Sequence, residues 1–229
     1  MSLRLAARTS NGVQGGHIVR TADLVRDGPA SGGSILFKSV YPGEEITAIM
    51  IENATREKGS IAMKEIYLAG GCFWGLQKFF DQFDGVLSTE VGYANGPDNR
   101  DGHSPTYEEV CRSSGHAETV KIIYDEERVS LPELLRYYFM VIDPLSVNRQ
   151  GNDRGIQYRT GIYYTDSDQL REIGPVYDAE QEKAGKPLAV ELEEIRNFFS
   201  AEEYHQKYLE KNPGGYCHIP DRYYHLASS

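Results

Sequence analysis

Cysteine is scarce in this sequence, which contains only Cys72, Cys111 and Cys217 among 229 residues. Such an odd and widely spaced set does not form the dense disulfide framework of a small secreted domain. Long hydrophobic runs are also missing: no stretch reaches the ~18 apolar residues that span a bilayer, and the N-terminus lacks the apolar core of a secretory signal. We therefore expect a cytoplasmic protein with reduced thiols and no membrane partner.

An excess of basic residues is missing as well. The formal charge is −10, with 24 Lys and Arg against 34 Asp and Glu. Residues 61–229 are the acidic part, with 17 basic and 28 acidic side chains. Surfaces that bind nucleic acid need clustered Lys and Arg to neutralise phosphates. We therefore expect no nucleic-acid partner.

The hydrophobic pattern changes near residue 60. Residues 1–33 are rich in Gly, Ser and Arg without a sustained period, which predicts a flexible arm. Residues 34–52 contain two short apolar runs around a turn signal, which predict short strands. We therefore divide the chain into an N-terminal extension, 1–60, and a main domain, 61–229.

In the main domain the chain alternates between strand-like and helix-like periods. The order is β-α-β, then a polar loop, then β-α-β, which is the split pattern of ferredoxin-like sandwiches. We predict an α+β fold whose mixed, mostly antiparallel sheet carries helices on one face. The expected strands cover 66–69, 86–93, 119–124, 157–164 and 188–192, and the expected helices cover 73–83, 131–142, 167–184 and 200–212.

Local signals add detail to these helices. A serine followed three residues later by glutamate predicts capped helix starts at Ser130 and Ser200. The Gly174-Pro175 pair predicts a kink or a split in the third helix, because proline lacks the N–H that a helix interior needs. The tail, 216–229, has no period and should be irregular.

The run at 70–75, GGCFWG, joins a strand to a helix and holds the only tryptophan. A free cysteine has a pKa of about 8.5, and unpaired N–H groups at a helix N-terminus favour its thiolate. We therefore expect Cys72 to be reactive. The alternative is a small buried hydrophobic residue, which is the common state of a free cysteine, but the flanking glycines favour the reactive form.

Three further polar segments could supply partners for this thiol, since sites are usually built where loops meet strand ends. Taken singly, each has a simple structural interpretation: Glu118 as a surface carboxylate, and Tyr107 and Tyr158 as half-buried packing in a chain with 16 tyrosines. The segments are TYEE at 106–109, GHAE at 115–118 and QGNDRGIQYR at 150–159.

Taken together, these segments resemble the A-type peptide methionine sulfoxide reductases over roughly residues 64–220. The resemblance implies reduction of the S epimer of methionine sulfoxide, free or in oxidised proteins, since each reductase type serves one epimer. It also implies no bound cofactor or metal, with thioredoxin, or dithiothreitol in vitro, as the reductant. The motifs that carry it are GGCFWG at 70–75, PTY at 105–107, GHAE at 115–118, the run at 150–159 and GYC at 215–217.

By this resemblance Cys72 is the nucleophile that attacks the sulfoxide sulfur and is left as a sulfenic acid. Glu118 matches the acid that protonates the oxygen, and a glutamic acid that is neutral at pH 7 needs a raised pKa. Cys217, on a glycine-rich tail, matches the resolving thiol that condenses with the sulfenic acid to a disulfide.

The other implied site residues surround the sulfoxide. Tyr107 and Tyr158 would donate hydrogen bonds to its oxygen as negative charge gathers there. Asp153 matches the family's supporting acid, linked directly or through water. Phe73 and Trp74 would exclude water and receive the methyl group of the substrate.

The sequence departs from the family pattern in three places. Residues 1–60 lie outside the resemblance. Ser104 stands where the family commonly has asparagine, in a long loop, and no cysteine follows the resolving thiol, so we expect a single resolving step. Cys111 has no motif around it and is expected at a strand edge with a structural role. A zinc site with His116 would lack further ligands.

Two other functions fit parts of the sequence. A cysteine hydrolase could pair Cys72 with His116 or His205, since thiolate and imidazole catalyse acyl transfer together, but it leaves the last cysteine unexplained. A non-catalytic binding domain could hold an apolar or methylated ligand on Phe73, Trp74 and the tyrosines. In that case Cys72 would be dispensable.

Overall fold

The computed structural model describes residues 6–14, 17–25, 63–97 and 102–228, and the chain forms two compact units, Met1–Gly59 and Ser60–Ser229. In the first unit, β1 (Ala6–Gln14) and β2 (His17–Val25) pair as an antiparallel hairpin. We predicted no regular structure in this part of the extension, and the hairpin differs from that prediction. The missed signal is the Gly15-Gly16 dipeptide, which suits two-residue hairpin loops. The strands predicted at 34–52 lie outside the described residues.

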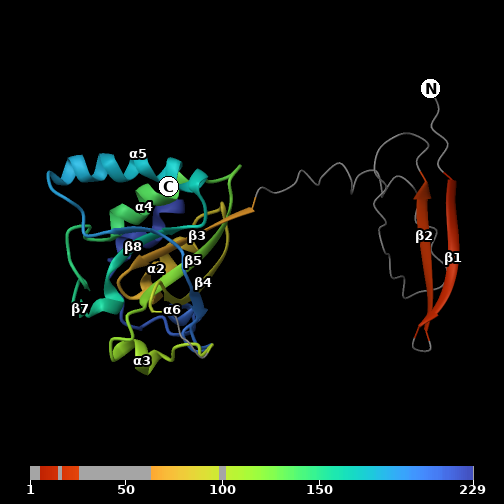
Figure 1. Cartoon of the computed structure of the whole chain (residues 1–229), viewed down its shortest axis with the longest axis horizontal. Coiled ribbons are helices and arrows are strands. Elements are labelled where there is room, and N and C mark those ends of the chain that lie inside the picture. Colours follow the sequence, from red (N-terminus) through yellow and green to blue (C-terminus); the bar gives the residue numbers. More distant parts are fainter. Residues whose placement is uncertain (1–5, 15–16, 26–62, 98–101, 229) are drawn as a thin grey trace. The chain divides into compact units, whose positions relative to one another are not determined.

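The second unit is built on a six-stranded sheet in the order β10-β4-β5-β3-β8-β9 (Figure 1). Neighbouring strands are antiparallel except β8 and β9, which are parallel. The strands are β3 (Met63–Gly70), β4 (Val86–Ala94), β5 (Ala117–Asp125), β8 (Thr160–Tyr164), β9 (Glu191–Glu194) and β10 (Phe198–Ser200).

The four central strands have the ferredoxin-like connection. The crossover from β3 through α2 (Phe73–Phe80) to β4 leaves a gap that β5 fills, and the crossover from β5 through α4 (Leu131–Val141) to β8 passes over β3. The prediction of an α+β fold with a mostly antiparallel mixed sheet is confirmed. The remaining elements are α3 (Tyr107–Cys111), β6 (Arg149–Gln150), β7 (Asp153–Arg154), η1 (Ile156–Tyr158), α5 (Ser167–Ala184), α6 (Tyr208–Lys211) and η2 (Asp221–Ser228).

The core follows the two-residue period of the strands. On one face of β3, Ile66 and Leu68 are fully buried and belong to the main core with Phe79 of α2. Each such buried side chain stabilises the fold by about 1.5–3 kcal/mol. On the other face, Tyr67 belongs to a smaller cluster and its ring lies 5.2 Å from that of Phe198 on β10. The helix α5 covers α4 from outside (Figure 1).

The predicted cap at Ser130 is wrong, and of the two alternatives for Pro175 the split is wrong. Ser130 precedes α4, but its side chain makes no capping hydrogen bond. The capping box forms instead at Thr106 and Glu109, at the start of α3. Pro175 does not split α5, which runs unbroken from Ser167 to Ala184. Pro175 and Arg171 are both exposed, so water can satisfy the Arg171 carbonyl that proline leaves without a donor.

The predicted helix at 200–212 is also wrong in extent, because Ser200 ends strand β10 and only Tyr208–Lys211 is helical. Long-range hydrogen bonds replace the helix: the Gln206 side chain binds both the N–H and the carbonyl of Val91, at 3.0 and 2.8 Å. Lys207 then adopts a left-handed conformation with φ 53°.

Three smaller boundaries differ from the predictions. The strand expected at 157–164 begins only at Thr160, after a 3₁₀ turn, and the strand expected at 188–192 covers Glu191–Glu194. The tail contains the 3₁₀ helix η2 instead of being irregular throughout. Within the described ranges, no helix is both long and apolar enough to cross a membrane.

Candidate active site

Cys72 lies at the junction between β3 and α2, where it is the N-cap residue of the helix. The turn needs glycine at position 71, because Gly71 has φ +83° and a Cβ there would lie 2.5 Å from the Cβ of Gln150. The thiol is only 7% exposed. The local sequence therefore presents the sulfur at the start of a helix, as predicted, but inside the protein.

Burial raises the pKa of the Cys72 thiol well above its usual value, and the charge of Glu118 raises that pKa further. The N–H of Trp74 at the start of α2 lowers the pKa, but this effect is smaller. Our expectation that the helix N-terminus would make this thiol ionise readily is therefore wrong. Because an ionised Glu118 opposes the thiolate, the two groups favour a state with one shared negative charge or none.

Glu118 lies on β5 and is 1% exposed. Burial raises its pKa from 4.5 to about 8; the Phe73 N–H, which donates to Oε2 at 3.1 Å, lowers the pKa, and the charge of Asp153 raises it. The raised pKa that a proton donor needs is present. At neutral pH most molecules therefore hold a neutral carboxylic acid beside the first residue of α2.

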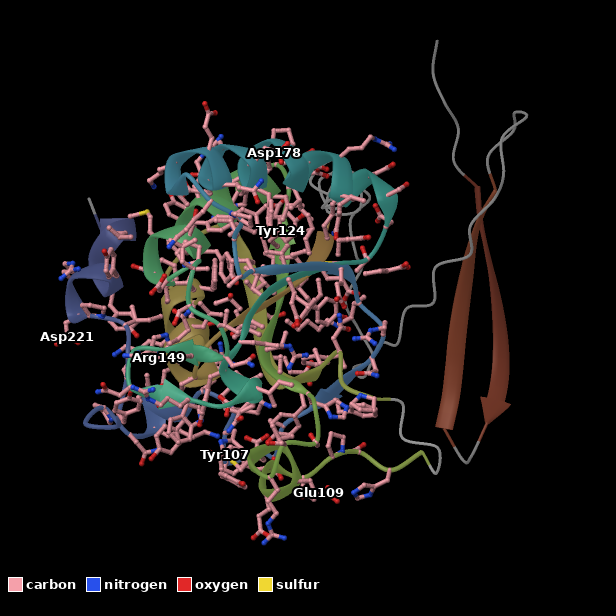
Figure 2. All side chains as sticks on the ribbon, turned by 60° about the vertical axis from the view of Figure 1, so that its left-hand side comes forward. Tyr107, Glu109, Tyr124, Arg149, Asp178 and Asp221 are labelled. Carbon is pink, nitrogen blue, oxygen red and sulfur yellow. The ribbon has the colours of Figure 1, made fainter. Side chains whose placement is uncertain are left out.

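The charge of the Glu118 carboxyl group affects the pKa of two tyrosines. Burial raises the pKa of both Tyr107 and Tyr158, and the charge of Glu118 is the second cause in each case. Both hydroxyls therefore stay protonated and can donate hydrogen bonds at neutral pH. Tyr107 begins α3, at the opposite end of the domain from Asp178 on α5 (Figure 2). Its backbone N–H donates to Oε1 of Glu202 at 3.0 Å.

Asp153 lies in the short β6–β7 hairpin and is half-buried. The Tyr216 hydroxyl donates a hydrogen bond to its Oδ2 at 3.2 Å. The charge of Asp153 raises the pKa of Cys72, Glu118 and Tyr158. Asp153 therefore lies close enough to act on the site electrostatically and disfavours a second negative charge there.

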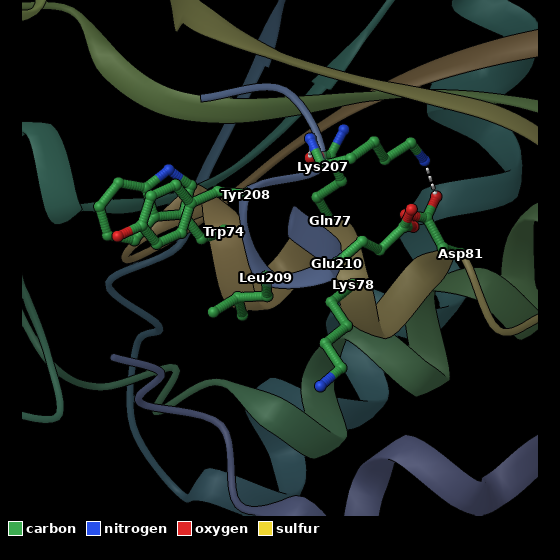
Figure 3. Close-up of a pocket in the computed structure, with 8 residues that line it drawn as sticks. All are labelled: Trp74, Gln77, Lys78, Asp81, Lys207, Tyr208, Leu209 and Glu210. Atoms are coloured by element: carbon green, nitrogen blue, oxygen red, sulfur yellow. Dashed lines mark hydrogen bonds and ion pairs between the residues drawn. The ribbon is translucent and has the colours of Figure 1, made fainter. Parts of the chain in front are cut away.

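Trp74 is held in a fixed orientation from two sides. Its indole N–H donates to Nδ1 of His205 at 3.0 Å, and its ring stacks on Tyr208 with centroids 3.8 Å apart and planes 15° from parallel (Figure 3). Phe73 is only 1% exposed and packs in the main core, with its ring 5.2 Å from that of His205. Of the two predicted methyl-binding rings, only Trp74 is partly exposed.

The hollow in Figure 3 is not the reaction site. It is lined by Trp74, Gln77, Lys78, Asp81 and residues 207–210, and it includes neither the thiol at the helix start nor the buried carboxyl. An ion pair crosses it, from Lys207 Nζ to Asp81 Oδ1 at 2.5 Å. The hollow therefore marks where the chain after β10 is fastened to α2.

Cys217 packs against the first turn of α2. Its Sγ lies 2.7 Å from the point that a Cβ on Gly75 would occupy, and 2.7 Å from the hydroxyl of Tyr224. All three cysteines are free thiols, and Cys217 acts electrostatically on the pKa of Cys72. The sulfur of Cys217 thus packs against a residue only three positions after Cys72, although the two cysteines are 145 positions apart in the sequence.

The structure does not support the cysteine hydrolase. Nδ1 of His116 bonds to the Ser114 hydroxyl at 3.0 Å, and Nδ1 of His205 accepts the Trp74 indole N–H. Among the described residues, neither imidazole is hydrogen-bonded to Cys72. Burial also lowers the pKa of both histidines. His116 is therefore bound within its own loop, to a residue two positions before it.

A family model described as "Peptide methionine sulfoxide reductase" matches residues 64–226. The chain belongs to this family. The match includes all six strands of the second unit's sheet except Met63, the first residue of β3, and it leaves the β1–β2 hairpin outside. It also spans the predicted site residues from Cys72 to Cys217. The family predicted from the motifs is therefore confirmed.

Named relatives agree. The chain is 57% identical over 157 residues to peptide methionine sulfoxide reductase MsrA of Lachnoclostridium phytofermentans, covering 68% of this chain and 92% of the relative. For MsrA of Clostridium acetobutylicum, identity is 54% over 159 residues, covering 69% and 96%. Mxr1 from Saccharomyces cerevisiae in reduced form superposes with a TM-score of 0.65 at 38% identity, covering 68% and 88%. Methionine sulfoxide reductase A of Corynebacterium diphtheriae gives 0.62 at 33%, covering 71% and 85%.

The sequence prediction missed the segment after β10. Oε1 and Oε2 of Glu202 accept hydrogen bonds from the Tyr107 N–H and the Tyr93 hydroxyl, at 3.0 and 2.7 Å, while His205 holds Trp74. The available signal was the run at 201–208, AEEYHQKY, which mixes acids, rings and amides without an apolar period. Cys111 was also misplaced: it ends α3 and is exposed, instead of lying at a strand edge.

The raised pKa of Glu118 predicts a pH-dependent stability. The folded state holds this proton more tightly than the unfolded state, so stability is lost as pH rises from about 4.5 to about 8. We expect Glu118→Gln to remove this loss. Its free energy of unfolding should exceed that of the wild type by on the order of 5 kcal/mol at about pH 9 and by little at about pH 4.5, measured by urea unfolding.

Glu109→Gln is the opposite control for this experiment. Hydrogen bonds within the α3 capping box lower the pKa of Glu109 to about 2, so its contribution is present above the unfolded pKa and is lost in acid. This variant should be less stable than the wild type at neutral pH, and the difference should shrink as pH falls. Parallel pH profiles for the two variants would contradict the assignment of a neutral Glu118.

Proposed function

We propose that this chain reduces the S epimer of methionine sulfoxide, free and in oxidised proteins, to methionine by thiol chemistry. The observation that carries the proposal is the pairing of Cys72 with a buried carboxyl group, Glu118, whose pKa is about 8. The N–H of Phe73, the residue after the thiol, binds that carboxyl at 3.1 Å. A nucleophile and a proton donor thus meet at one helix start.

In the first step the sulfur of Cys72 attacks the sulfoxide sulfur. The oxygen needs a proton as it accumulates negative charge, and Glu118 is the group that is neutral and close enough to give it. Tyr107 and Tyr158 keep their hydroxyl hydrogens and donate to the same oxygen. The oxygen is transferred to Cys72, so thiol plus sulfoxide gives sulfenic acid plus methionine, and no other reductant enters this step.

The aromatic wall supports a methyl-bearing substrate. The hydrogen bond to His205 and the stack on Tyr208 fix the Trp74 indole, so that it offers a rigid apolar surface two residues after the thiol. A chiral sulfoxide that places its oxygen towards Glu118 and its methyl group towards Trp74 can expose its sulfur to Cys72 in one configuration only. This three-point arrangement is the basis for proposing a single epimer.

In the second step Cys217 attacks the sulfenic acid, a disulfide forms and water leaves. The sulfur of Cys217 already packs against Gly75, within one helical turn of Cys72, and the glycines at 214 and 215 allow the tail to adjust. A dithiol protein of the thioredoxin class is the proposed reductant, since thiol–disulfide exchange with two thiols returns both cysteines to the reduced state. Dithiothreitol should replace it in vitro.

The test separates the two steps with Cys217→Ser. Without reductant, this variant and the wild type should each form about one methionine per chain from the S epimer and none from the R epimer. Mass spectrometry should then find a disulfide between Cys72 and Cys217 in the wild type, and a sulfenic acid at Cys72 in the variant. Thioredoxin-driven turnover should fall to background in the variant, while turnover with dithiothreitol persists.

Cys111→Ser is the matched control, because it removes the exposed thiol on α3 and leaves both proposed sulfurs in place. It should behave as the wild type in every assay. If Cys217→Ser cycled normally with thioredoxin, the resolving role would belong to another group. If wild type reduced neither epimer, the proposed reaction itself would be wrong.

A further inference from the structure

One face of α2 and of the turn that follows it is covered by the C-terminal 3₁₀ helix η2. The contacts recur at helical spacing: the Gly75 carbonyl accepts from the Tyr224 hydroxyl at 3.3 Å, and Lys78 Nζ lies 4.5 Å from the centre of the Tyr224 ring. One turn further on, the Gln82 side chain donates to the carbonyl of Tyr223 at 2.8 Å and accepts from the N–H of Leu226 at 3.1 Å. The segment with Asp221, labelled in Figure 2, is thus fastened to the helix that begins at the reactive thiol.

Cys217 lies beside this helix, and its sulfur lies among a small set of polar groups that we call the seat: the Ile219 N–H, the Tyr224 hydroxyl and the Gly75 carbonyl. Its sulfur accepts a hydrogen bond from the N–H of Ile219 at 3.3 Å and lies 2.7 Å from the Tyr224 hydroxyl. The same hydroxyl reaches the Gly75 carbonyl. Burial and the hydrogen bond with Cys217 raise the pKa of Tyr224, so its phenol keeps its hydrogen at neutral pH.

We propose that Tyr224 is the positioning residue of the resolving step. Its hydroxyl holds the sulfur of Cys217 beside the first turn of α2, and it donates a hydrogen bond to that sulfur as the thiol loses its proton. The proposal rests on the function proposed above for Cys217. The hydroxyl carries one hydrogen and has two acceptors within reach, the Gly75 carbonyl and the sulfur. It can therefore turn from the carbonyl to the sulfur when the sulfur becomes negative.

The step balances without a further reactant. The Cys217 sulfur forms a bond to the Cys72 sulfur, the S–O bond of the sulfenic acid breaks, and the hydroxyl leaves as water with the proton that the Cys217 thiol releases. Cys72 is reduced from the sulfenic to the disulfide level, and Cys217 is oxidised to it. Tyr224 ends the step as it began, with its hydrogen, because it only orients the sulfur and solvates the transient charge.

Gly75 completes the seat by having no side chain. A Cβ at this position would lie 2.7 Å from the sulfur of Cys217, closer than real Cβ contacts allow. Gly75→Ala would otherwise favour the helix, since glycine inside a helix costs roughly 0.5–1 kcal/mol relative to alanine. The glycine at this position of the GGCFWG run thus leaves room for the second sulfur.

Tyr224→Phe tests the proposal, because it removes only the hydroxyl and keeps the ring under Lys78. We expect an unchanged first turnover of methionine without reductant. The disulfide between Cys72 and Cys217 should form about tenfold more slowly, which matches the loss of one hydrogen bond to a charged group. Quenched reactions trapped with dimedone should show a sulfenic acid at Cys72 that lasts longer than in the wild type.

Tyr223→Phe is the matched control, since it changes the neighbouring ring of η2, whose hydroxyl accepts a hydrogen bond from the side chain of Arg222 at 3.4 Å. It should resolve at the wild-type rate. Gly75→Ala is the second variant, and it should also slow resolution, because its Cβ would displace the sulfur of Cys217. If Tyr224→Phe resolved as fast as the wild type, the proposal would be wrong. If the wild type formed no disulfide at all, the proposed resolving role of Cys217 would itself be wrong.

Discussion

Cys72→Ser should abolish methionine formation with either dithiothreitol or thioredoxin, by at least about 10³-fold in turnover. Serine keeps the size and position of the side chain but offers a hydroxyl that barely ionises at neutral pH, and it cannot carry the oxygen as a sulfenic acid. The measurement is methionine released from the S epimer, followed by chromatography, with the number of free thiols counted before and after the reaction.

The variant should fold, since Cys72 is buried without a side-chain capping bond and serine is nearly isosteric. Its melting temperature, compared with that of Cys111→Ser, checks this point. Retained methionine formation in Cys72→Ser would exclude the mechanism. Binding of a methyl sulfoxide by a wild-type protein that never turns it over would instead favour the non-catalytic binding domain, in which the aromatic wall at Trp74 only holds a ligand.

Glu118→Gln should slow the first turnover by about 10²–10³-fold, because an amide occupies the same space but gives up no proton to the sulfoxide oxygen. The pH profile carries a further signature. Glu118 must be protonated to act, and its pKa is about 8, so the first-turnover rate of the wild type should fall above about pH 8. The residual rate of the variant should show no such fall.

Single-turnover kinetics at saturating substrate measures this profile without interference from the resolving step. Glu109→Gln, on the exposed side of α3, is the control and should keep the wild-type rate and profile. A wild-type profile without a fall above about pH 8, or a Glu118→Gln variant as fast as the wild type, would show that the proton comes from another group, for which the Tyr107 and Tyr158 hydroxyls are the nearest candidates.

The order of the main domain's central strands and helices along the chain could be predicted from the sequence, because it depends on repeated local information. Ile66 and Leu68 alternate with Tyr67 along β3, which indicates the buried face of the strand. Leu76, Phe79 and the other aromatic residues of α2 follow a helical period, which indicates the buried face of the helix. The order β-α-β, loop, β-α-β then leaves few unknotted topologies. The motif at 70–75 added the position of the reactive thiol at a helix start.

The segment after β10 could not be predicted in this way. The pair Ser200 and Glu203 has the spacing of a helix start, but the Gln206 side chain finds both backbone groups of Val91 more than 100 residues away. Lys207 then takes a left-handed conformation, and its ammonium group bonds to Asp81. The helix predicted from local propensity does not form here, because hydrogen bonds to residues of β4 and to Asp81 at the end of α2 stabilise another conformation. No pattern within the segment predicts those partners.

The sequence by itself singled out the residues that we propose for the chemistry: the thiol at 72, a second thiol at 217, the carboxyl at 118 and the rings around them. Only the tertiary structure decided their state. Cys72 belongs to a helix N-terminus, which should lower the pKa of its thiol, yet burial against Glu118 raises it. The reason is that desolvation and charge depend on groups that folding brings to one helix turn: Glu118 of β5, Asp153 of the β6–β7 hairpin and Cys217 of the tail.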